Sequence, residues 1–220
     1  TTRRALSGLC ALIKAAQGEK TSPGKIAILF SRPQNSPQGG NHMGVVPEFF
    51  PGYRDINNAS NREKVEKLWG IKLSDNIFRK DAVNIIDLAL NGKLKALYVM
   101  GENPIINYPV GKDIQAALKR VDFVVVQDTF LTETAQLADV VFPAATFAEK
   151  EGTFTNMGMT VQPLNKAIQP VGDAKPDWQI ICELAKKMGH AYSYLSAKDI
   201  LSEIGSITPI YVGINYDRLK

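Results

Sequence analysis

Polar residues follow directly after two apolar runs in the middle of this 220-residue chain, and they are its strongest candidates for chemistry. The run LYVM ends at residues 101–104 (GENP), and the run FVVV ends at Gln127 and Asp128. Because the carboxyl ends of parallel strands meet at one edge of a sheet, Asn103 and Gln127 could face one crevice. Carboxamides and carboxylates suit ribose hydroxyls and purine edges, which need matched donors and acceptors. An ordinary Asn-Pro turn is the alternative for residues 101–104.

Three further polar side chains stand where helices are expected to begin. Thr132 and Thr134 follow the second run, and the backbone N–H groups of a first helical turn favour a phosphate. Simple capping explains both threonines equally well. Asp177 lies in the segment KPDW, where a carboxylate commonly complements the helix dipole. A carboxylate can also accept hydrogen bonds from the ring N–H and the amino group of guanine, which makes Asp177 a candidate for base recognition.

Other reactive side chains give weaker signals. Arg32 opens a proline-rich segment directly after the run KIAILF, and its planar fork matches two oxygens of a small carboxylate or a phosphate. His42 is one of two histidines, and the sequence predicts no metal site because no second ligand stands at the right spacing. The charge run Glu149, Lys150, Glu151 is typical of a solvated face. No GxGxxG fingerprint, P-loop or nucleophile elbow is present, so NAD, FAD and serine hydrolase chemistry have no support.

These residues need alternating strands and helices to position them. Apolar periodicity predicts helices at 5–16, 61–69, 81–90, 113–119, 132–137 and 176–188, and strands at 25–30, 96–100, 123–126 and 138–142. Residues 31–61 are rich in proline and glycine, which predicts a long functional loop. The alternation favours a single α/β domain over residues 1–220, with a doubly wound, mostly parallel sheet and helices on both faces.

Composition and charge exclude several classes of protein. Hydrophobic residues make up 45% of the chain and charged residues 22%, and no apolar run approaches a membrane span. The net charge of +4 is interleaved with acidic residues, so we expect neither a nucleic-acid partner nor direct membrane insertion. Cys10 and Cys182 belong to no C-x-x-C motif, which predicts core cysteines in a reducing, cytoplasmic setting. The abrupt helical start without an initiator Met suggests a piece of a longer chain.

Taken together, the landmarks follow the order of a known family. They comprise Gln34-Asn35, Gln38-Gly39, His42-Met43-Gly44, Pro51-Gly52-Tyr53, Gly101-Glu102-Asn103-Pro104, Gln127-Asp128, Thr132-Glu133-Thr134-Ala135, Ala138-Asp139-Val140, Pro143-Ala144, residues 149–156 and Asp177-Trp178-Gln179. This set resembles the molybdopterin oxidoreductases that carry a bis(guanine dinucleotide) cofactor, and formate dehydrogenase alpha subunits most of all. The similarity runs from residue 1 to about residue 211.

The resemblance implies a role for each landmark. One guanine dinucleotide would have its ribose and phosphates lined by Gly101, Glu102, Asn103, Gln127, Asp128 and Thr132. Asp177 would bind its guanine, Arg32 would orient formate near the metal, and Gln34 would lie on the pterin side. The implied reaction is oxidation of formate to carbon dioxide at molybdenum or tungsten.

The same resemblance makes the chain a fragment of a larger catalytic subunit. A 4Fe-4S cluster elsewhere in that subunit would pass the electrons on. The partners would be the remaining domains of the subunit, iron–sulfur or electron-acceptor subunits, and formate. The fragment alone would be inactive, because the metal-ligating cysteine or selenocysteine lies in the missing part.

Two positions depart from the family pattern. Many relatives read N-x-E-R-R-x-Q where this chain has residues 156–162 (NMGMTVQ), so the basic pair is absent. His42 stands where the D-M-G landmark has its Asp. The large iron–sulfur subunit of respiratory NADH:quinone oxidoreductase (complex I) is an alternative with a structural role, and a free-standing nucleotide-binding module is a third. Arg32 and Gln34 favour formate dehydrogenase.

Overall fold

The computed structural model describes residues 36–73, 82–109, 111–190 and 192–219. By its internal contacts the chain divides into residues 1–33 and 34–220, and the described residues belong to the second unit. The expected helix 5–16 and strand 25–30 lie outside the described residues, as do Arg32 and Gln34.

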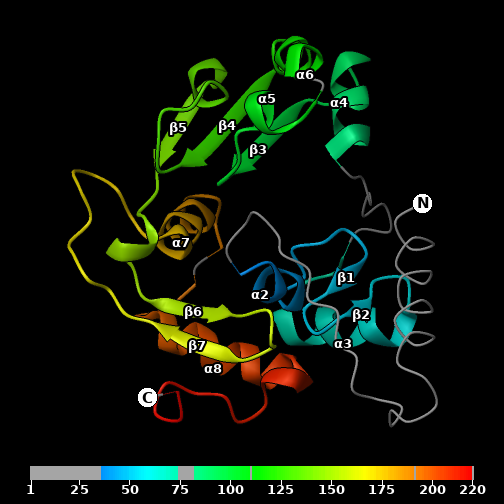
Figure 1. The fold of residues 1–220 in the computed structure, drawn as a ribbon. Coiled ribbons are helices and arrows are strands. Elements are labelled where there is room, and N and C mark those ends of the chain that lie inside the picture. Colours follow the sequence, from blue (N-terminus) through cyan, green and yellow to red (C-terminus); the bar gives the residue numbers. More distant parts are fainter. Residues whose placement is uncertain (1–35, 74–81, 110, 191, 220) are drawn as a thin grey trace, which may run out of the picture. The chain divides into compact units, whose positions relative to one another are not determined.

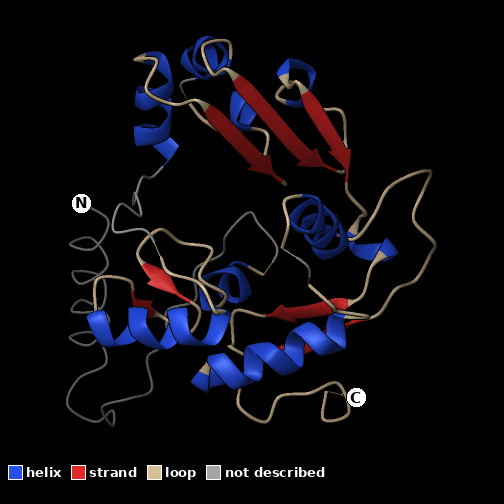
Figure 2. Ribbon diagram, turned by 180° about the vertical axis from the view of Figure 1, so that it is seen from behind, coloured by secondary structure: helices blue, strands red, loops and turns tan. Residues whose placement is uncertain are grey.

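A parallel sheet is the framework for the candidate site (Figures 1 and 2). It consists of β3 (Ala96–Met100), β4 (Phe123–Asp128) and β5 (Val140–Pro143), in the order β3-β4-β5. The register pairs Met100 with Gln127 and Gln127 with Phe142, so all three strands end at one edge. Parallel neighbours with intervening helices confirm the predicted α/β class.

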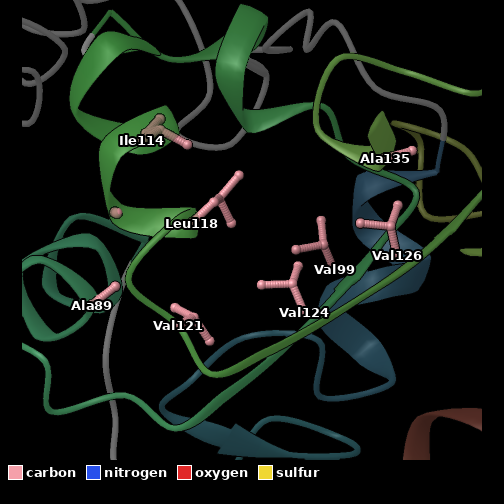
Figure 3. Packing of buried hydrophobic residues seen from close by; sticks show 9 residues of the cluster. Ala89, Val99, Ile114, Leu118, Val121, Val124, Val126 and Ala135 are labelled. Carbon is pink, nitrogen blue, oxygen red and sulfur yellow. The ribbon is translucent and has the colours of Figure 1, made fainter. Parts of the chain in front are cut away.

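One face of this sheet packs against α4 (Ala82–Leu90) and α6 (Gly111–Leu118). Side chains alternate along a strand, so Val124 and Val126 point to this same face. The glycine that follows Asn91 has a φ of 64°, the left-handed conformation that commonly ends a helix. The buried cluster shown in Figure 3 contains Ala89, Val99, Ile114, Ala117, Leu118, Val121, Val124, Val126 and Ala135.

The other face of the sheet carries a different kind of side chain. Gln127 follows Val126 and points to this second face, where it is fully buried. Tyr98 and Phe142 share the face, with their ring centroids 6.5 Å apart. Just past the end of β5, Ala144 forms an isolated parallel bridge with Lys175. Lys175 lies shortly before α7 (Asp177–Lys187), so this bridge places the start of α7 next to the end of β5. The second face therefore combines aromatic and polar side chains and leads to the start of α7.

The segment expected as a continuous loop, residues 31–61, needs correction over its described part. It contains α2 (Pro37–His42), β1 (Phe49–Phe50), β2 (Arg54–Asp55) and the beginning of α3 (Ala59–Trp69). A proline at the first position of α2 supplies a helical φ, which suits a helix start. Asn58 caps α3 by accepting from the N–H of Asn61 at 3.2 Å, so this helix begins earlier than its apolar pattern suggests.

The carboxyl-terminal part holds elements that the periodicity did not predict. An antiparallel pair forms from β6 (Gly152–Thr155) and β7 (Val161–Leu164), and a further helix is α8 (Ala197–Ile207). Ser196 and Asp199 form a capping box at the start of α8, in which the Asp199 carboxylate accepts from the Ser196 N–H at 2.9 Å. Among the described residues, no helix has the length and apolar character needed to cross a membrane.

Candidate functional site

Gln127 links three elements at the carboxyl edge of the sheet. Its Nε2 donates to Asp177 Oδ1 at 2.8 Å, and its Oε1 accepts from the hydroxyl of Tyr98. An ionised carboxylate can only accept, so Asp177 sets which end of the amide faces it, and the Tyr98 hydroxyl must donate to the other end. Gln127 is 0% exposed, so it lies behind Asp177 and holds that carboxylate in place.

The second oxygen of Asp177 faces a cation. Lys150 Nζ donates to Asp177 Oδ2, and the two side chains are 27% and 32% exposed. Burial, followed by the negative charge of Asp177, raises the pKa of Tyr98, which therefore stays a neutral donor. Asp177 thus combines an oriented carboxylate with partial access from solvent, which a base-recognition residue requires.

Glu149 is the residue that sequence reasoning placed wrongly. It was expected on a solvated face, but it is 4% exposed and belongs to a capping box with Thr146. Its carboxylate accepts from the N–H of Thr146 at 2.8 Å and from that of Val171 at 3.1 Å. The Thr146 bond is the main cause that lowers the pKa of Glu149, against the opposing effect of burial. The anchored Glu149 fixes the backbone from which Lys150 reaches Asp177.

A separate polar network follows β3. Thr134 Oγ1 donates to Asn103 Oδ1, and Asn103 Nδ2 donates to Glu133 Oε2, both at 2.7 Å. The bond from Asn103 is the main cause that lowers the pKa of Glu133. The side chains of Asn103 and Gln127 therefore belong to different networks. Their strands meet through the backbone, where the N–H of Gly101 donates to the carbonyl of Gln127 at 2.9 Å.

Gly101 leaves room at this strand end. It has a φ of 61°, and no atom lies within 4 Å of the position that a Cβ would take. A glycine here gives the backbone the left-handed conformation and leaves space for a ligand to approach it. Glu102, the next residue, accepts a hydrogen bond from Asn107 Nδ2 of the short helix α5 (Pro104–Asn107).

Asp128 and Thr132 shape the turn after β4. Asp128 Oδ1 accepts from the N–H of Phe130 at 3.1 Å, and Thr132 Oγ1 accepts from the N–H of Ala135 at 3.2 Å. The helix expected at 132–137 is only the short turn η1 (Ala135–Leu137). Capping therefore accounts for Thr132 locally, and a phosphate contact stays a prediction.

The part of the chain that the structure describes holds no cluster of three or more His, Cys, Asp or Glu side chains placed to bind a metal. What it does hold is a fixed polar cluster at the carboxyl edge of a parallel sheet. Open α/β folds bind ligands at this edge.

Comparison with known proteins identifies the family. The molybdopterin oxidoreductase family model matches residues 1–187. The chain therefore belongs to the molybdopterin oxidoreductase family.

Within this family, the chain is similar to formate dehydrogenase alpha subunits, as two curated relatives show. The F420-dependent formate dehydrogenase subunit alpha of Methanocaldococcus jannaschii is 47% identical over 191 residues, which covers 86% of this chain and 28% of that protein. The F420-dependent formate dehydrogenase 1 subunit alpha of Methanococcus maripaludis is 41% identical over 192 residues, with the same shares. The chain thus spans a little over a quarter of the length of these relatives. The expected resemblance to formate dehydrogenase alpha subunits is confirmed at this level.

A solved structure shows the same fold. Acetylene hydratase from Pelobacter acetylenicus superimposes with a TM-score of 0.52 at 24% identity, over 73% of this chain and 23% of that one.

Proposed function

We propose that this chain is the part of a formate dehydrogenase-type catalytic subunit that binds one guanine dinucleotide of its molybdopterin cofactor. The observation that carries the proposal is Asp177, a carboxylate at the start of α7 that Gln127 holds at 2.8 Å and that is 32% exposed. Family membership and the formate dehydrogenase relatives at 41–47% identity support the cofactor and the reaction.

The donors and acceptors around Asp177 suit this group. Guanine presents an N–H and an amino group side by side, and a carboxylate accepts from both. Asp128 and Glu102 supply carboxylates and Asn103 an amide, which suit ribose hydroxyls, while the open space beside Gly101 admits a ligand close to the backbone. Thr132 completes the set of binding residues with its hydroxyl, while Gln127, expected to line the ribose and phosphates, is fully buried and orients Asp177 from behind.

The remaining assignments rest on the resemblance to formate dehydrogenase alpha subunits. When bound, the metal–pterin group supplies the two-electron oxidation of formate to carbon dioxide. Arg32 orients formate through its guanidinium, and Gln34 lies on the pterin side. The metal is molybdenum or tungsten, a 4Fe-4S cluster lies in another part of the subunit, and electrons leave through an iron–sulfur or acceptor subunit in the cytoplasm.

The test is the natural full-length protein, purified without oxygen. We expect molybdenum or tungsten in about equal amount to the subunit, pterin on release of the cofactor, and formate-dependent reduction of an artificial electron acceptor. Elemental analysis, pterin fluorescence and the dye assay measure these in turn. A protein with iron and sulfide but neither pterin nor molybdenum or tungsten contradicts the proposal and favours the complex I-like structural role.

A further inference from the structure

Lys150 stands beside the one oxygen of Asp177 that Gln127 does not hold. Gln127 Nε2 donates to Oδ1, and Lys150 Nζ donates to Oδ2. An ammonium carries three N–H donors, and the bond to Asp177 uses one of them. The order of groups at this place is therefore two acceptors, the carboxylate oxygens, followed by a donor, the ammonium.

The hydrogen-bonding edge of guanine has the complementary order. Its amino group and ring N–H donate, and its O6, next in line, accepts. When a carboxylate accepts from the amino group and from the N–H, O6 falls on the side of the oxygen that binds the N–H. Lys150 occupies such a place beside Oδ2.

We propose that Lys150 donates to O6 of the bound guanine, so that Asp177 and Lys150 together select guanine by all three positions of its edge. The proposal rests on the guanine site proposed above and adds its specificity. Adenine has an acceptor ring nitrogen where guanine has the N–H, and an amino group where guanine has O6. Its ring nitrogen would therefore repel the carboxylate, and its amino group would face the ammonium of Lys150. Hypoxanthine lacks the amino group and would lose the hydrogen bond from that group to the carboxylate.

Two features preset this arrangement before a ligand arrives. The buried Gln127 amide is held by the Tyr98 hydroxyl, so it orients Asp177 as a positioning residue. The anchored Glu149 restricts the backbone of Lys150. Groups held in place lose little conformational freedom on binding, which favours selectivity.

A hollow of about 230 Å³ lies against the same lysine. Lys150, Pro176 and Trp178 are among its lining residues, and the last two flank Asp177 in the chain. Asp177 is not among its described lining residues, so the hollow shows open space beside Lys150 and not the position of the base itself.

The test measures nucleotide binding by the full-length protein prepared from cells that cannot make the pterin. Isothermal titration compares GMP with IMP, which lacks the amino group, and with 6-thio-GMP, whose sulfur is a weak acceptor in place of O6. We expect the protein to prefer GMP over each analogue by roughly tenfold. For each variant, the affinity for GMP is divided by the affinity for the analogue. This ratio is used because removal of Lys150 also frees Asp177 Oδ2, which changes the absolute affinity for every nucleotide.

Four variants separate the contributions. Lys150→Met is expected to abolish the preference over 6-thio-GMP and keep the preference over IMP, while Lys150→Arg keeps both. Lys175→Met is the matched control, because it removes another paired lysine, 2.8 Å from Glu183, and should leave both ratios unchanged. Asp177→Asn is expected to abolish the preference over IMP.

The outcomes distinguish the two proposals. A 6-thio-GMP ratio in Lys150→Met equal to that of the unaltered protein overturns the role of Lys150 and leaves the guanine site intact. An unchanged IMP ratio in Asp177→Asn, or no binding of GMP by the unaltered protein, contradicts the guanine site itself.

Discussion

Two polar clusters of this chain, each built around a buried side chain, differ in how far they reach toward solvent. The cluster of Tyr98, Gln127 and Asp177 runs from the sheet interior to a half-exposed ion pair with Lys150. The second cluster surrounds His42, which is 4% exposed and lies edge-on to the rings of Tyr53 and Tyr211, with centroids 5.3 and 5.8 Å away.

The second cluster consists of buried side chains with the partly exposed ring of Tyr53 beside them. The Tyr211 hydroxyl shares a hydrogen bond of 2.9 Å with Thr155 Oγ1, and Thr155 is also buried. His42 Nε2 is buried without a hydrogen-bond partner among the described residues. The first cluster ends in a charged pair that solvent reaches, whereas His42, Thr155 and Tyr211 are buried, so residue type alone does not distinguish the two clusters.

Of the changes considered, loss of the Gln127 amide should have the largest effect on the first cluster. Gln127→Leu leaves Asp177 Oδ1 without its donor and the Tyr98 hydroxyl without its acceptor. We expect the free energy of unfolding of the full-length protein to fall by about 2 kcal/mol, because two partly buried hydrogen bonds are lost, one of them to a charge. Bound guanine nucleotide should fall as well. Urea unfolding and nucleotide analysis measure both.

Tyr98→Phe is the graded control for that prediction, since it removes only the hydroxyl. The expected loss is about 1 kcal/mol, because Gln127 Oε1 alone becomes unpaired. Equal losses in the two variants would contradict the view that Gln127 acts mainly by holding Asp177.

Acid should weaken the second cluster. Burial lowers the pKa of His42, so its unfolded form takes up a proton at a higher pH than its folded form does. Stability contributed by this residue is thus complete above the unfolded pKa of about 6.5 and is lost as the pH falls below it, by at most about 1.4 kcal/mol per pH unit. The measurement is urea unfolding between pH 7 and pH 5, compared with His42→Phe.

The variant removes the titrating ring and keeps the aromatic contacts. Its pH dependence should be shallower than that of the unaltered protein over this range. Identical slopes would show that His42 does not titrate differently in the folded and unfolded states.

Local sequence patterns predicted the sheet and its helices well. The helix expected at 176–188 is α7 (Asp177–Lys187), and the strand expected at 96–100 is β3 (Ala96–Met100). Apolar period and nearby stop signals determine such elements, and both are readable in a single sequence. The S-x-x-D signal at Ser196 and Asp199 was also present, and it would have located α8.

The site itself could be predicted only in part. The candidate positions Asn103, Gln127 and Asp177 lie at strand ends and a helix start, as expected. Their partners could not be found, because Gln127 and Asp177 are 50 positions apart and Lys150 and Asp177 are 27 apart. The burial of Glu149 likewise depends on a distant backbone N–H. Periodicity carries no information on such pairings.

Guanine nucleotide content of Asp177→Ala tests the central claim most directly. The full-length protein and its variant would be purified together with Glu183→Gln, which alters the exposed ion pair between Glu183 of the same helix and Lys175. Acid hydrolysis then releases the nucleotide for quantification. We predict a clear loss of GMP per subunit in Asp177→Ala and none in Glu183→Gln. Equal GMP in all three proteins would contradict the assignment of Asp177 to the cofactor site.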